Sequence, residues 1–297
     1  MKRVSVIVPT FREGERLTDC LQALRNQTCP SSQFEVIVID NTPEFELRGA
    51  GFHEARLLHE PRPGPYAARN RGIAEARGEA LAFTDADCLP NPTWIEEGLD
   101  ALTSYPEGAL IAGEIEVFAH NPDRPTAAEL FEIGHAFPQE HYARDRQFGA
   151  TANVFVTRDV IETVGSFDGA LISGGDSEFG RRVHDAGFPI VYAERAVVRH
   201  PGRRTLKELF SKMRRDVRGA RDLERAAQLP RGTFVSGFFH DLRPPVQTCW
   251  RLLRDPHLGG GLSGIKAAGV MVLWRYYRAG YRLWLLLGDL NGRTDRF

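Results

Sequence analysis

Short apolar runs alternate with helical patterns from residue 4 to residue 84, and no other feature of the sequence constrains the fold as strongly. The strand-like runs are residues 4–9, 34–39, 56–59 and 80–84. Between them, apolar residues recur at helical spacing over 13–27 and 66–76. Because the strand-like runs are apolar without alternation, both faces of their sheet are covered. We therefore expect an α/β fold with an open, mostly parallel sheet and helices on both faces.

Polar residues directly follow three of these strands, at the edge where open α/β sheets bind their ligands. They are Thr10 with Phe11, Asp40 with Asn41, and the tripeptide 85–87. Asp40 has two interpretations. It is either a carboxylate that accepts hydrogen bonds from a ribose or base, or a cap for the turn at 41–43.

The tripeptide Asp85-Ala86-Asp87 closes the last of these strands. Residues two apart in an extended chain project to the same side, so both carboxylates can face one point beyond the strand end. Paired oxygen ligands suit Mg²⁺ or Mn²⁺, which bind through one or two carboxylates together with substrate phosphates. Aspartate is also common in turns, so the tripeptide indicates a metal site only together with other motifs.

Another acidic candidate, Asp176, lies in the segment 174–179, which leads into a short helical pattern ending near Gly187. A carboxylate at a helix start is usually a cap. A general base can occupy the same place, because flanking glycines let a substrate approach closely. Spacing alone leaves both roles open.

Charge is distributed unevenly along a chain of 297 residues whose net charge is −1. Residues 1–202 hold 19 Lys and Arg against 31 Asp and Glu, whereas residues 203–297 hold 19 against 8. This asymmetry predicts an acidic domain over 1–203 that can bind a cation. It also predicts a basic, mostly helical extension over 204–297 that can meet phosphates or an anionic membrane.

Composition and cysteine usage narrow the class of protein further. A chain that is 42% hydrophobic and 26% charged is neither disordered, nor collagen-like, nor a disulfide scaffold. The cysteines have no C-x-x-C or zinc spacing, and the N-terminus shows no signal-peptide pattern. We therefore expect reduced thiols in a cytoplasmic protein. The four cysteines are Cys20, Cys29, Cys88 and Cys249.

Several ordered sequence blocks carry a resemblance to a known family. They are Val4–Phe11, Asp40 after its strand, Gly64–Ile73 with Ala76–Glu79, and Phe83–Asp87. In this order they resemble glycosyltransferase family 2. Three later blocks are similar to the acceptor side of that family: Gly149–Asn153, Val164–Asp168 and Gly175–Glu178. The resemblance covers about residues 3–200 and leaves the tail unexplained.

The resemblance implies an inverting, metal-dependent transferase of the GT-A fold, of the kind that builds cell-envelope polysaccharides. Such an enzyme moves a sugar from a nucleotide-diphosphate sugar, a UDP-sugar by default, to a hydroxyl of a glycan or lipid-linked acceptor. Asp176 matches the family's catalytic base. By similarity, the ligands of Mn²⁺ or Mg²⁺ are Asp87, Asp85 and His200, although His200 can equally be a structural histidine. The residues expected around the nucleotide sugar are Pro9, Thr10, Phe11, Glu13, Asp40, Arg69, Asp85, Ala86 and Asp87.

The chain departs from the family pattern at three places. Gly175 stands where an acidic residue commonly precedes the base, and Cys88 stands where another acid often follows the metal pair. The run Ile39–Thr42 replaces the usual double aspartate with Gly-Ser. The metal pair and the base are retained, so these departures concern substrate preference.

The tail carries a basic segment and a long apolar segment. Residues 203–225 have a net charge of +5, which suits lipid headgroups, a polyprenyl-phosphate acceptor or a solvated helix face, and no nucleic-acid motif accompanies them. The apolar run 265–288 is interrupted by Arg275, Arg278 and Arg282 on one helical stripe. We expect either a helix at the membrane interface, or one docked on the catalytic domain with its arginines in water.

Other functional classes fit the sequence less well. A non-catalytic nucleotide-sugar or carbohydrate-binding module is the main alternative, and product analysis distinguishes it from an enzyme. A sugar-1-phosphate nucleotidyltransferase needs a glycine-rich phosphate loop after the first strand, whereas this chain has Thr10–Gly14 there. A dinucleotide-dependent oxidoreductase is excluded because no G-x-G-x-x-G occurs at that turn.

Overall fold

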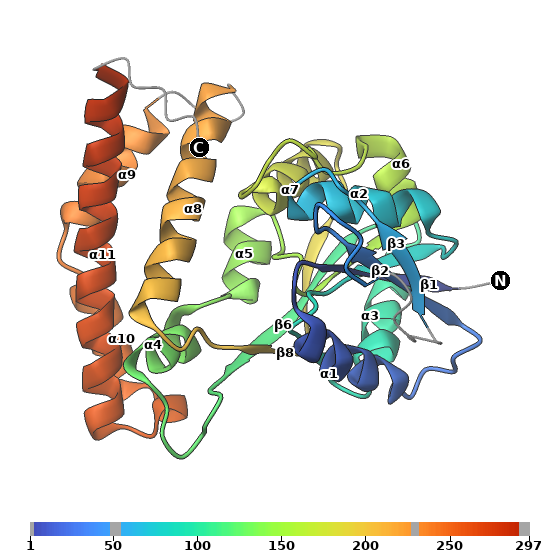
Figure 1. Cartoon of the computed structure of the whole chain (residues 1–297), viewed down its shortest axis with the longest axis horizontal. Helices are drawn as coiled ribbons and strands as arrows, with labels where there is room; N and C mark the ends of the chain where they lie inside the picture. Colours follow the sequence, from blue (N-terminus) through green and yellow to red (C-terminus); the bar gives the residue numbers. More distant parts are fainter. Residues whose placement is uncertain (1–2, 48–54, 227–231, 291–297) are drawn as a thin grey trace. The chain divides into compact units, whose positions relative to one another are not determined.

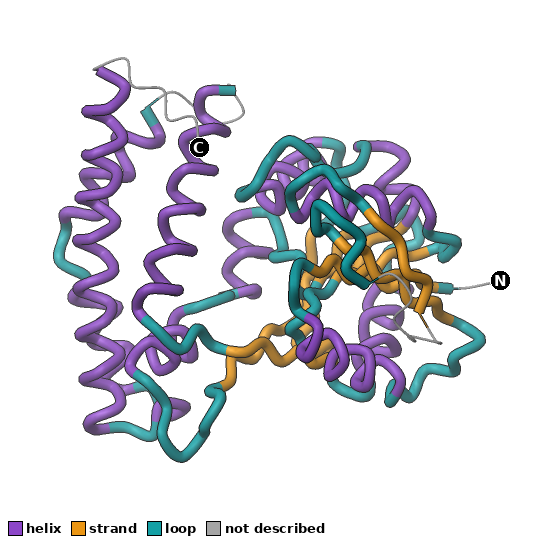
Figure 2. Tube along the Cα trace, in the orientation of Figure 1, coloured by secondary structure: helices purple, strands orange, loops and turns teal. Residues whose placement is uncertain are grey.

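The computed structural model describes residues 3–47, 55–226 and 232–290, which fall into two compact units (Figures 1 and 2). One, which we name the sheet unit, comprises Met1–Glu116 and Phe137–Pro201. The other, the helical unit, comprises Val117–Ala136 and Gly202–Phe297. The change at residue 202 lies close to the boundary predicted near 203, and the structure adds the segment Val117–Ala136 to the helical unit.

Eight strands of the described residues form one mixed sheet in the order β3-β2-β1-β4-β7-β6-β8-β5. The pairs among β3, β2, β1 and β4 are parallel, as the apolar runs predict. Antiparallel pairs join β7 to β4, β6 to β7, and β5 to β8. The strands are β1 (Val4–Thr10), β2 (Phe34–Asp40), β3 (Ala55–His59), β4 (Ala80–Phe83), β5 (Leu89–Pro90), β6 (Leu110–Phe118), β7 (Val154–Thr157) and β8 (Ile190–Pro201).

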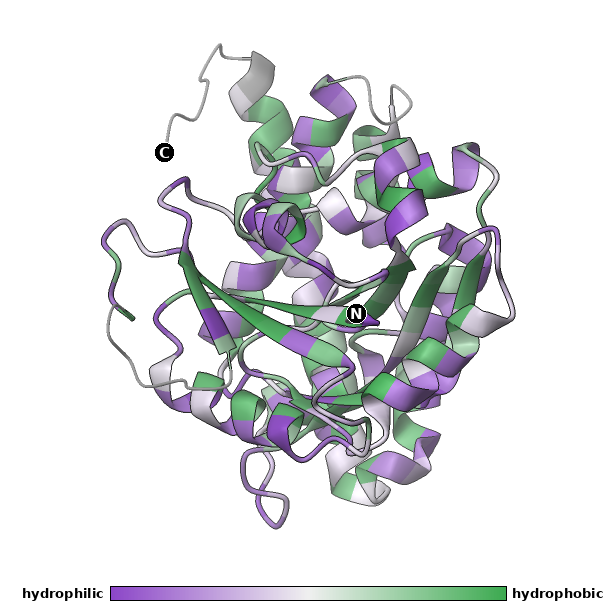
Figure 3. Cartoon of the chain, turned by 90° about the vertical axis from the view of Figure 1, so that its right-hand side faces the viewer, coloured by the Kyte–Doolittle hydropathy of each residue, from purple (hydrophilic) through white to green (hydrophobic). Residues whose placement is uncertain are grey.

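Alternate strand residues enter two hydrophobic cores, one on each face of the sheet. Val4, Val6 and Val8 pack with α1 (Gly14–Arg25) and α3 (Trp94–Thr103). Ile7 and its neighbours in β2 and β4 pack on the opposite face, which three helices cover. These helices are α2 (Pro65–Glu75), α6 (Arg158–Val164) and α7 (Gly175–Asp185). The strands are coloured mainly as hydrophobic in Figure 3 because both faces are buried.

A further helix of the sheet unit, α5 (Gln139–Arg146), packs near β8, the strand that ends at His200 and Pro201. Its Ala143 is buried in the same core as α2 and α7. The carboxyl ends of β1, β2 and β4 lie at one edge of the sheet because these strands are parallel. The polar residues selected from the sequence therefore gather at this edge.

The helical unit is built around α11 (Gly261–Leu290), which packs against α4, α8, α9 and α10. Capping boxes start two of these helices: Thr126 pairs with Glu129, and Thr205 pairs with Glu208. No helix of the described residues combines the length and hydropathy needed to cross a bilayer. The other bounds are α4 (Ala127–His135), α8 (Leu206–Arg225), α9 (Thr233–Leu242), α10 (Val246–Arg254) and the 3₁₀ turn Pro256–Leu258.

Candidate active site

A pocket of about 320 Å³ opens at the carboxyl ends of β1 and β2. Thr10 and Asp40 face each other there in register across the parallel pair. A pocket of this size is at the small end of the range for ligand sites. Its lining residues are Thr10, Arg12, Glu13, Gly14, Asp40, Thr42, Glu46 and Leu47.

Asp40 forms the turn cap that one of the two sequence interpretations predicted. Its carboxylate accepts hydrogen bonds from the Thr42 amide at 3.0 Å, the Thr42 hydroxyl at 2.6 Å and the Leu47 amide at 2.9 Å. It therefore caps the turn that follows β2 and also lines the pocket. Burial alone would raise the pKa of Asp40, but these hydrogen bonds outweigh burial and lower the pKa. The carboxylate stays charged at neutral pH.

The metal candidates gather at the end of the neighbouring strand, β4. One potential ligand atom from each of Asp85, Asp87, Cys88 and His200 lies within 4.8 Å of the others. The antiparallel pair of β5 and β8, with Leu89 opposite Arg199, brings the chain after Asp87 beside His200. The structure thus assembles the three residues that the resemblance named as ligands, although 113 positions separate Asp87 from His200.

His200 is oriented so that one ring nitrogen faces the acidic pair. Its Nδ1 lies 2.8 Å from the Pro201 carbonyl oxygen, so we assign the proton to Nδ1. Its Nε2 then carries a lone pair 3.9 Å from Oδ1 of Asp87. The Phe137 ring packs on the imidazole with centroids 4.7 Å apart. This arrangement is typical of a histidine whose second nitrogen is fixed for metal binding.

The chemistry of the donor set fits a hard divalent cation. Two carboxylates suit Mn²⁺ or Mg²⁺, and the imidazole nitrogen of His200 adds a ligand of a kind that transition metals accept. Cys88 is also close, but burial raises the pKa of its thiol well above the ordinary value, with Asp85 and Asp87 adding to the rise. Sulfur is a soft ligand whereas Mg²⁺ and Mn²⁺ prefer oxygen, so Cys88 is not a ligand of the preferred kind.

Arg69 connects the metal candidates to the rest of the site. Its guanidinium Nη2 lies 2.6 Å from Oδ1 of Asp85, and its side chain is only 5% exposed. The guanidinium also lies over the Tyr66 ring at 5.6 Å. Its Nε has no hydrogen-bond partner among the described residues. A buried, incompletely paired cation at this position is suited to an anionic ligand such as a diphosphate.

Asp176 lies in the first turn of α7 but does not cap that helix. The N-cap is Gly174 and no side chain caps it. The Asp176 carboxylate instead accepts hydrogen bonds from the Thr151 amide at 3.2 Å and the Thr151 hydroxyl at 3.0 Å. Burial raises the pKa of Asp176, and the charge of Asp85 adds to the rise, while Arg69 and Thr151 oppose it. A half-buried carboxylate with a raised pKa is a suitable general base.

Tyr66 explains the glycine that precedes this aspartate. A Cβ atom on Gly175 would lie 2.7 Å from the Tyr66 ring, so no larger residue fits there without displacement. The Tyr66 hydroxyl accepts a hydrogen bond from the Asp176 amide at 3.3 Å. Tyr66 thus fills the space beside Gly175 and holds the backbone of Asp176.

The remaining predicted nucleotide residues differ in their exposure. Phe11 is 52% exposed and is not among the residues that line the pocket, Ala86 is buried, and Pro9 pairs with Ile39 inside the sheet. Glu13 lines the pocket and forms an ion pair with Arg16 at 3.4 Å. Burial raises the pKa of Glu13, and Asp87 adds to the rise against the charge of Arg16.

Two residues of the site were not predicted: Tyr66 and Thr151. Both stand inside the quoted sequence blocks, but their contacts with Asp176 cross 110 and 25 positions of the chain. Asn153 in the same block is structural, since its buried amide bonds Trp94, Glu114 and Ala196. The blocks alone therefore did not distinguish residues that contact Asp176 from scaffold residues such as Asn153.

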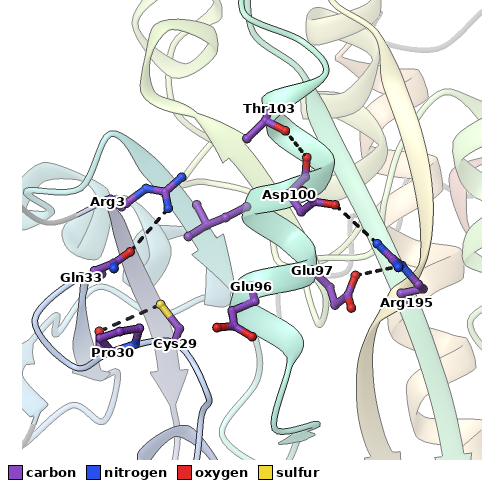
Figure 4. A pocket seen from close by; sticks show the side chains of 10 residues that line it. Arg3, Cys29, Pro30, Gln33, Glu96, Glu97, Asp100, Thr103 and Arg195 are labelled. Atoms are coloured by element: carbon purple, nitrogen blue, oxygen red, sulfur yellow. Dashed lines mark hydrogen bonds and ion pairs between the residues drawn. The ribbon is translucent and has the colours of Figure 1, made fainter.

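A larger cavity of about 500 Å³ contains none of these candidates (Figure 4). Arg3, just before β1, lines it, so it lies toward the amino end of that strand rather than at the ligand-binding edge. Arg195 also lines this cavity and forms ion pairs with Glu97 at 2.9 Å and with Asp100 at 3.4 Å; Figure 4 shows both pairs. Size alone therefore does not identify the active site.

Comparison with known proteins places the chain in a family. The model of glycosyl transferase family 2 matches residues 5–165, more than half of the chain. Glycosyltransferase AglE of Haloferax volcanii is 36% identical over 223 residues, which are 73% of this chain and 72% of AglE. The chain therefore belongs to glycosyltransferase family 2 and is a glycosyltransferase.

A more distant relative and a solved structure extend the comparison. A Methanococcus voltae protein, 22% identical over 64% of each chain, is named as a transferase that acts on dolichyl N-acetyl-alpha-D-glucosaminyl phosphate. Mannosyltransferase PcManGT from Pyrobaculum calidifontis, solved with GDP-Man and Mn²⁺, covers 98% of this chain and 88% of its own. Its TM-score is 0.62 at 16% identity. The fold is the GT-A fold with a helical C-terminal region, as the resemblance implied.

Proposed function

We propose that this glycosyltransferase moves a sugar, with inversion, from a nucleotide-diphosphate sugar to a hydroxyl of a glycan or lipid-linked acceptor. The observation that carries this proposal is a cluster of possible metal ligands together with a separate carboxylate. Asp85, Asp87 and His200 form the cluster, and the half-buried Asp176 supplies the separate carboxylate. Both lie beside Arg69, which is within hydrogen-bond distance of Asp85 and whose charge acts on the pKa of Asp176.

Two parts of the site receive the donor. The pocket at Thr10 and Asp40 receives the nucleoside. The charged carboxylate of Asp40 can accept hydrogen bonds there from hydroxyl groups of the ribose or from N–H groups of the base. Arg69 lies where a diphosphate meets Asp85. We take a UDP-sugar as the default donor, and the PcManGT complex with GDP-Man makes a guanosine donor the first comparison.

Asp85, Asp87 and His200 would hold Mn²⁺ or Mg²⁺. When bound, the cation supplies charge neutralisation for the diphosphate that leaves. Arg69 contributes a fixed positive charge to the same leaving group, and its buried position requires little rearrangement during the reaction. Asp87, paired to Arg16 at 3.8 Å, keeps its second oxygen near His200.

Asp176 is the general base of the proposal. It accepts the proton of the acceptor hydroxyl as that oxygen attacks the anomeric carbon and the bond to the diphosphate breaks on the opposite side. This in-line displacement inverts the anomeric configuration. A positioned base of this kind contributes about 10²–10⁴-fold to the rate. Tyr66 and Thr151 hold the base through its amide and its carboxylate.

The positive charge of the helical unit supports a location at a membrane surface. Its charge suits an anionic surface, and a lipid-linked acceptor would lie in such a surface. The Methanococcus voltae relative, named for a dolichyl phosphate substrate, supports this acceptor class. We therefore propose a cytoplasmic enzyme, peripheral at the inner face of the plasma membrane, with no nucleic-acid partner.

Turnover with product analysis tests this function. The wild-type chain is incubated with Mn²⁺ and single nucleotide sugars, and released nucleoside diphosphate is measured together with the anomeric configuration of the glycoside by proton NMR. The proposal predicts an inverted product from one donor class. A product that retains configuration would contradict Asp176 as the sole base. Tight donor binding without any turnover, across glycan and lipid-linked acceptors, would favour a non-catalytic nucleotide-sugar module.

A further inference from the structure

One helix of the helical unit presents an apolar stripe to its surroundings. Ile265, Val272, Tyr276, Leu283 and Leu287 of α11 recur at spacings of seven and four, so they lie along one side of the helix. Each is between 38 and 58% exposed. Of the described side chains of α11, the charged one that is exposed is Lys266, near the start of the helix. We call these five residues the outer stripe.

The arginines of the same helix point in another direction. Arg278 binds both carboxylate oxygens of Asp241 in α9, with Nε at 2.8 Å, and Arg282 reaches the same carboxylate at 3.0 Å. Arg275 donates to the carbonyl oxygens of His240 and Asp241. Asp241 is 1% exposed. The arginines therefore hold α9 to α11 and are not directed into water as one of the sequence interpretations expected.

This arrangement departs from the usual amphipathic helix. A helix in a water-exposed bundle normally packs its apolar side inward and leaves its charges outside. In α11 the arginines are internal and paired beside buried apolar residues such as Met271 and Leu285, while a second set of apolar residues is exposed. A contiguous exposed apolar surface of this kind marks a contact with a partner or a membrane. Its aromatic member, Tyr276, and the nearby Trp284, which is 52% exposed, are residue types typical of the lipid interface.

Cations of α8 lie at one flank of the exposed side of α11, next to Tyr277, which is 40% exposed, and to Tyr281, whose ring stacks on that of the exposed Trp284. On α8, Arg214 donates to the Tyr277 hydroxyl at 2.9 Å, and Arg218 donates to the Tyr281 hydroxyl at 2.5 Å. The Phe210 ring stacks on Tyr277 at 4.5 Å and fixes this side of α8 beside α11. Two cations at this flank favour an anionic partner. A second copy of the same stripe would bring a second set of cations to it without a counter-charge.

We propose that the outer stripe of α11 docks in the plane of an anionic lipid bilayer, with Arg214 and Arg218 at the phosphate headgroups. The stripe would lie at the boundary of headgroups and acyl chains rather than span the bilayer. This inference rests on the membrane location in the proposed function and names the surface that provides it. It does not depend on the donor, the metal or the base.

Vesicle flotation tests this surface. The full chain is mixed with vesicles of phosphatidylcholine alone, or of phosphatidylcholine with phosphatidylglycerol, and the floated fraction is measured at low and high salt. The test variant carries Tyr276→Glu and Leu287→Glu. The control carries Ile172→Glu in the sheet unit, because Ile172 and Leu287 are both 50% exposed. A second variant carries Arg214→Gln and Arg218→Gln.

We expect the wild type and the control to float with anionic vesicles. The stripe variant should partition at least tenfold less, because each lost apolar contact is worth about a factor of ten. The Arg214→Gln, Arg218→Gln variant should lose the salt-sensitive part of binding. Absence of wild-type flotation, or equal flotation of the stripe variant, would overturn the proposal.

Three further readouts distinguish loss of docking from dimer dissociation, unfolding and loss of the transferase reaction. Light scattering without vesicles measures the oligomeric state, and a dimer that the stripe variant dissociates would identify a second copy as the occupant and overturn the lipid proposal. Circular dichroism melting confirms that the variants are folded. Donor hydrolysis by the stripe variant should remain at the wild-type level, so a failure of docking and a failure of the proposed transferase reaction give different results.

Discussion

Replacing Asp176 by asparagine tests the base while leaving the surrounding structure nearly unchanged. The wild-type carboxylate accepts two hydrogen bonds from Thr151, one from its amide at 3.2 Å and one from its hydroxyl at 3.0 Å. The asparagine oxygen can still accept from the amide. Its NH₂ group can donate to the Thr151 hydroxyl, since a hydroxyl both donates and accepts. The isosteric variant therefore retains both contacts.

The effects on activity and stability should have opposite signs. Without a base, turnover should fall about 10²–10⁴-fold. The pKa of Asp176 is raised mainly by burial, so the folded protein disfavours the charged form. Such a group reduces folding stability once the pH rises above its unfolded value. Asparagine removes this charge, and the variant should melt at the same temperature or higher at pH 7.

Three measurements on Asp176→Asn decide the outcome: kcat with a saturating donor, nucleotide affinity by calorimetry, and the melting temperature. We expect a large loss of kcat, an unchanged affinity and no loss of Tm. The ordinary pKa of aspartate is 3.8, and the pKa of Asp176 is raised above it. In the wild type, kcat/KM should therefore decline as the pH is lowered through this raised pKa. Turnover within tenfold of wild type would refute the role of base. A Tm lower by several degrees would refute the account of its burial.

Four other substitutions probe the remaining parts of the site and the helical unit. Asp87→Ala should weaken Mn²⁺ binding at least tenfold in calorimetry, because it removes one metal ligand. Removing even a residue that only supports a ligand lowers metal affinity by about 10–100-fold. Tyr66→Phe keeps the ring but removes the hydrogen bond to the Asp176 amide, so kcat should fall about 2–10-fold with KM unchanged. Gly175→Ala should lower stability by about 1–3 kcal/mol in urea unfolding, since its Cβ meets the Tyr66 ring; no change would show that the ring moves freely. Asp241→Asn should destabilise the helical unit by about 3–5 kcal/mol through unpaired arginines, and an unchanged unfolding midpoint would contradict that estimate.

The parallel half of the sheet could be predicted from the sequence because its signal is local. Strands that are buried on both faces need apolar residues at consecutive positions, and such residues occur at 4–9, 34–39, 56–59 and 80–84. The two-residue strand β5 has no such signal. Its pairing with β8 joins residues more than 100 positions apart, and only the folded chain shows that this pairing brings Asp87 to His200.

The orientation of α11 shows a different limit. Periodicity identified a stripe of three arginines and an apolar remainder, but periodicity does not state which side is buried. The arginine side is buried because it binds Asp241, a single buried carboxylate in α9. Nothing in the local sequence distinguishes Asp241 from an exposed aspartate. The segment Val117–Ala136 joins the helical unit for a comparable reason, since its contacts with α10 and α11 are distant in sequence.

A thermal-shift panel tests the central claim, which is metal-dependent binding of a nucleotide at the carboxyl edge of the sheet. Uridine, guanosine, thymidine and cytidine diphosphates are compared with and without Mn²⁺ or Mg²⁺, using Asp87→Ala as the control. A ligand at 100 times its Kd adds about 2.7 kcal/mol, which raises Tm by several degrees. We predict such a shift for one base, dependent on the metal and lost in the variant. A shift of equal size without metal, or in Asp87→Ala, would contradict the account.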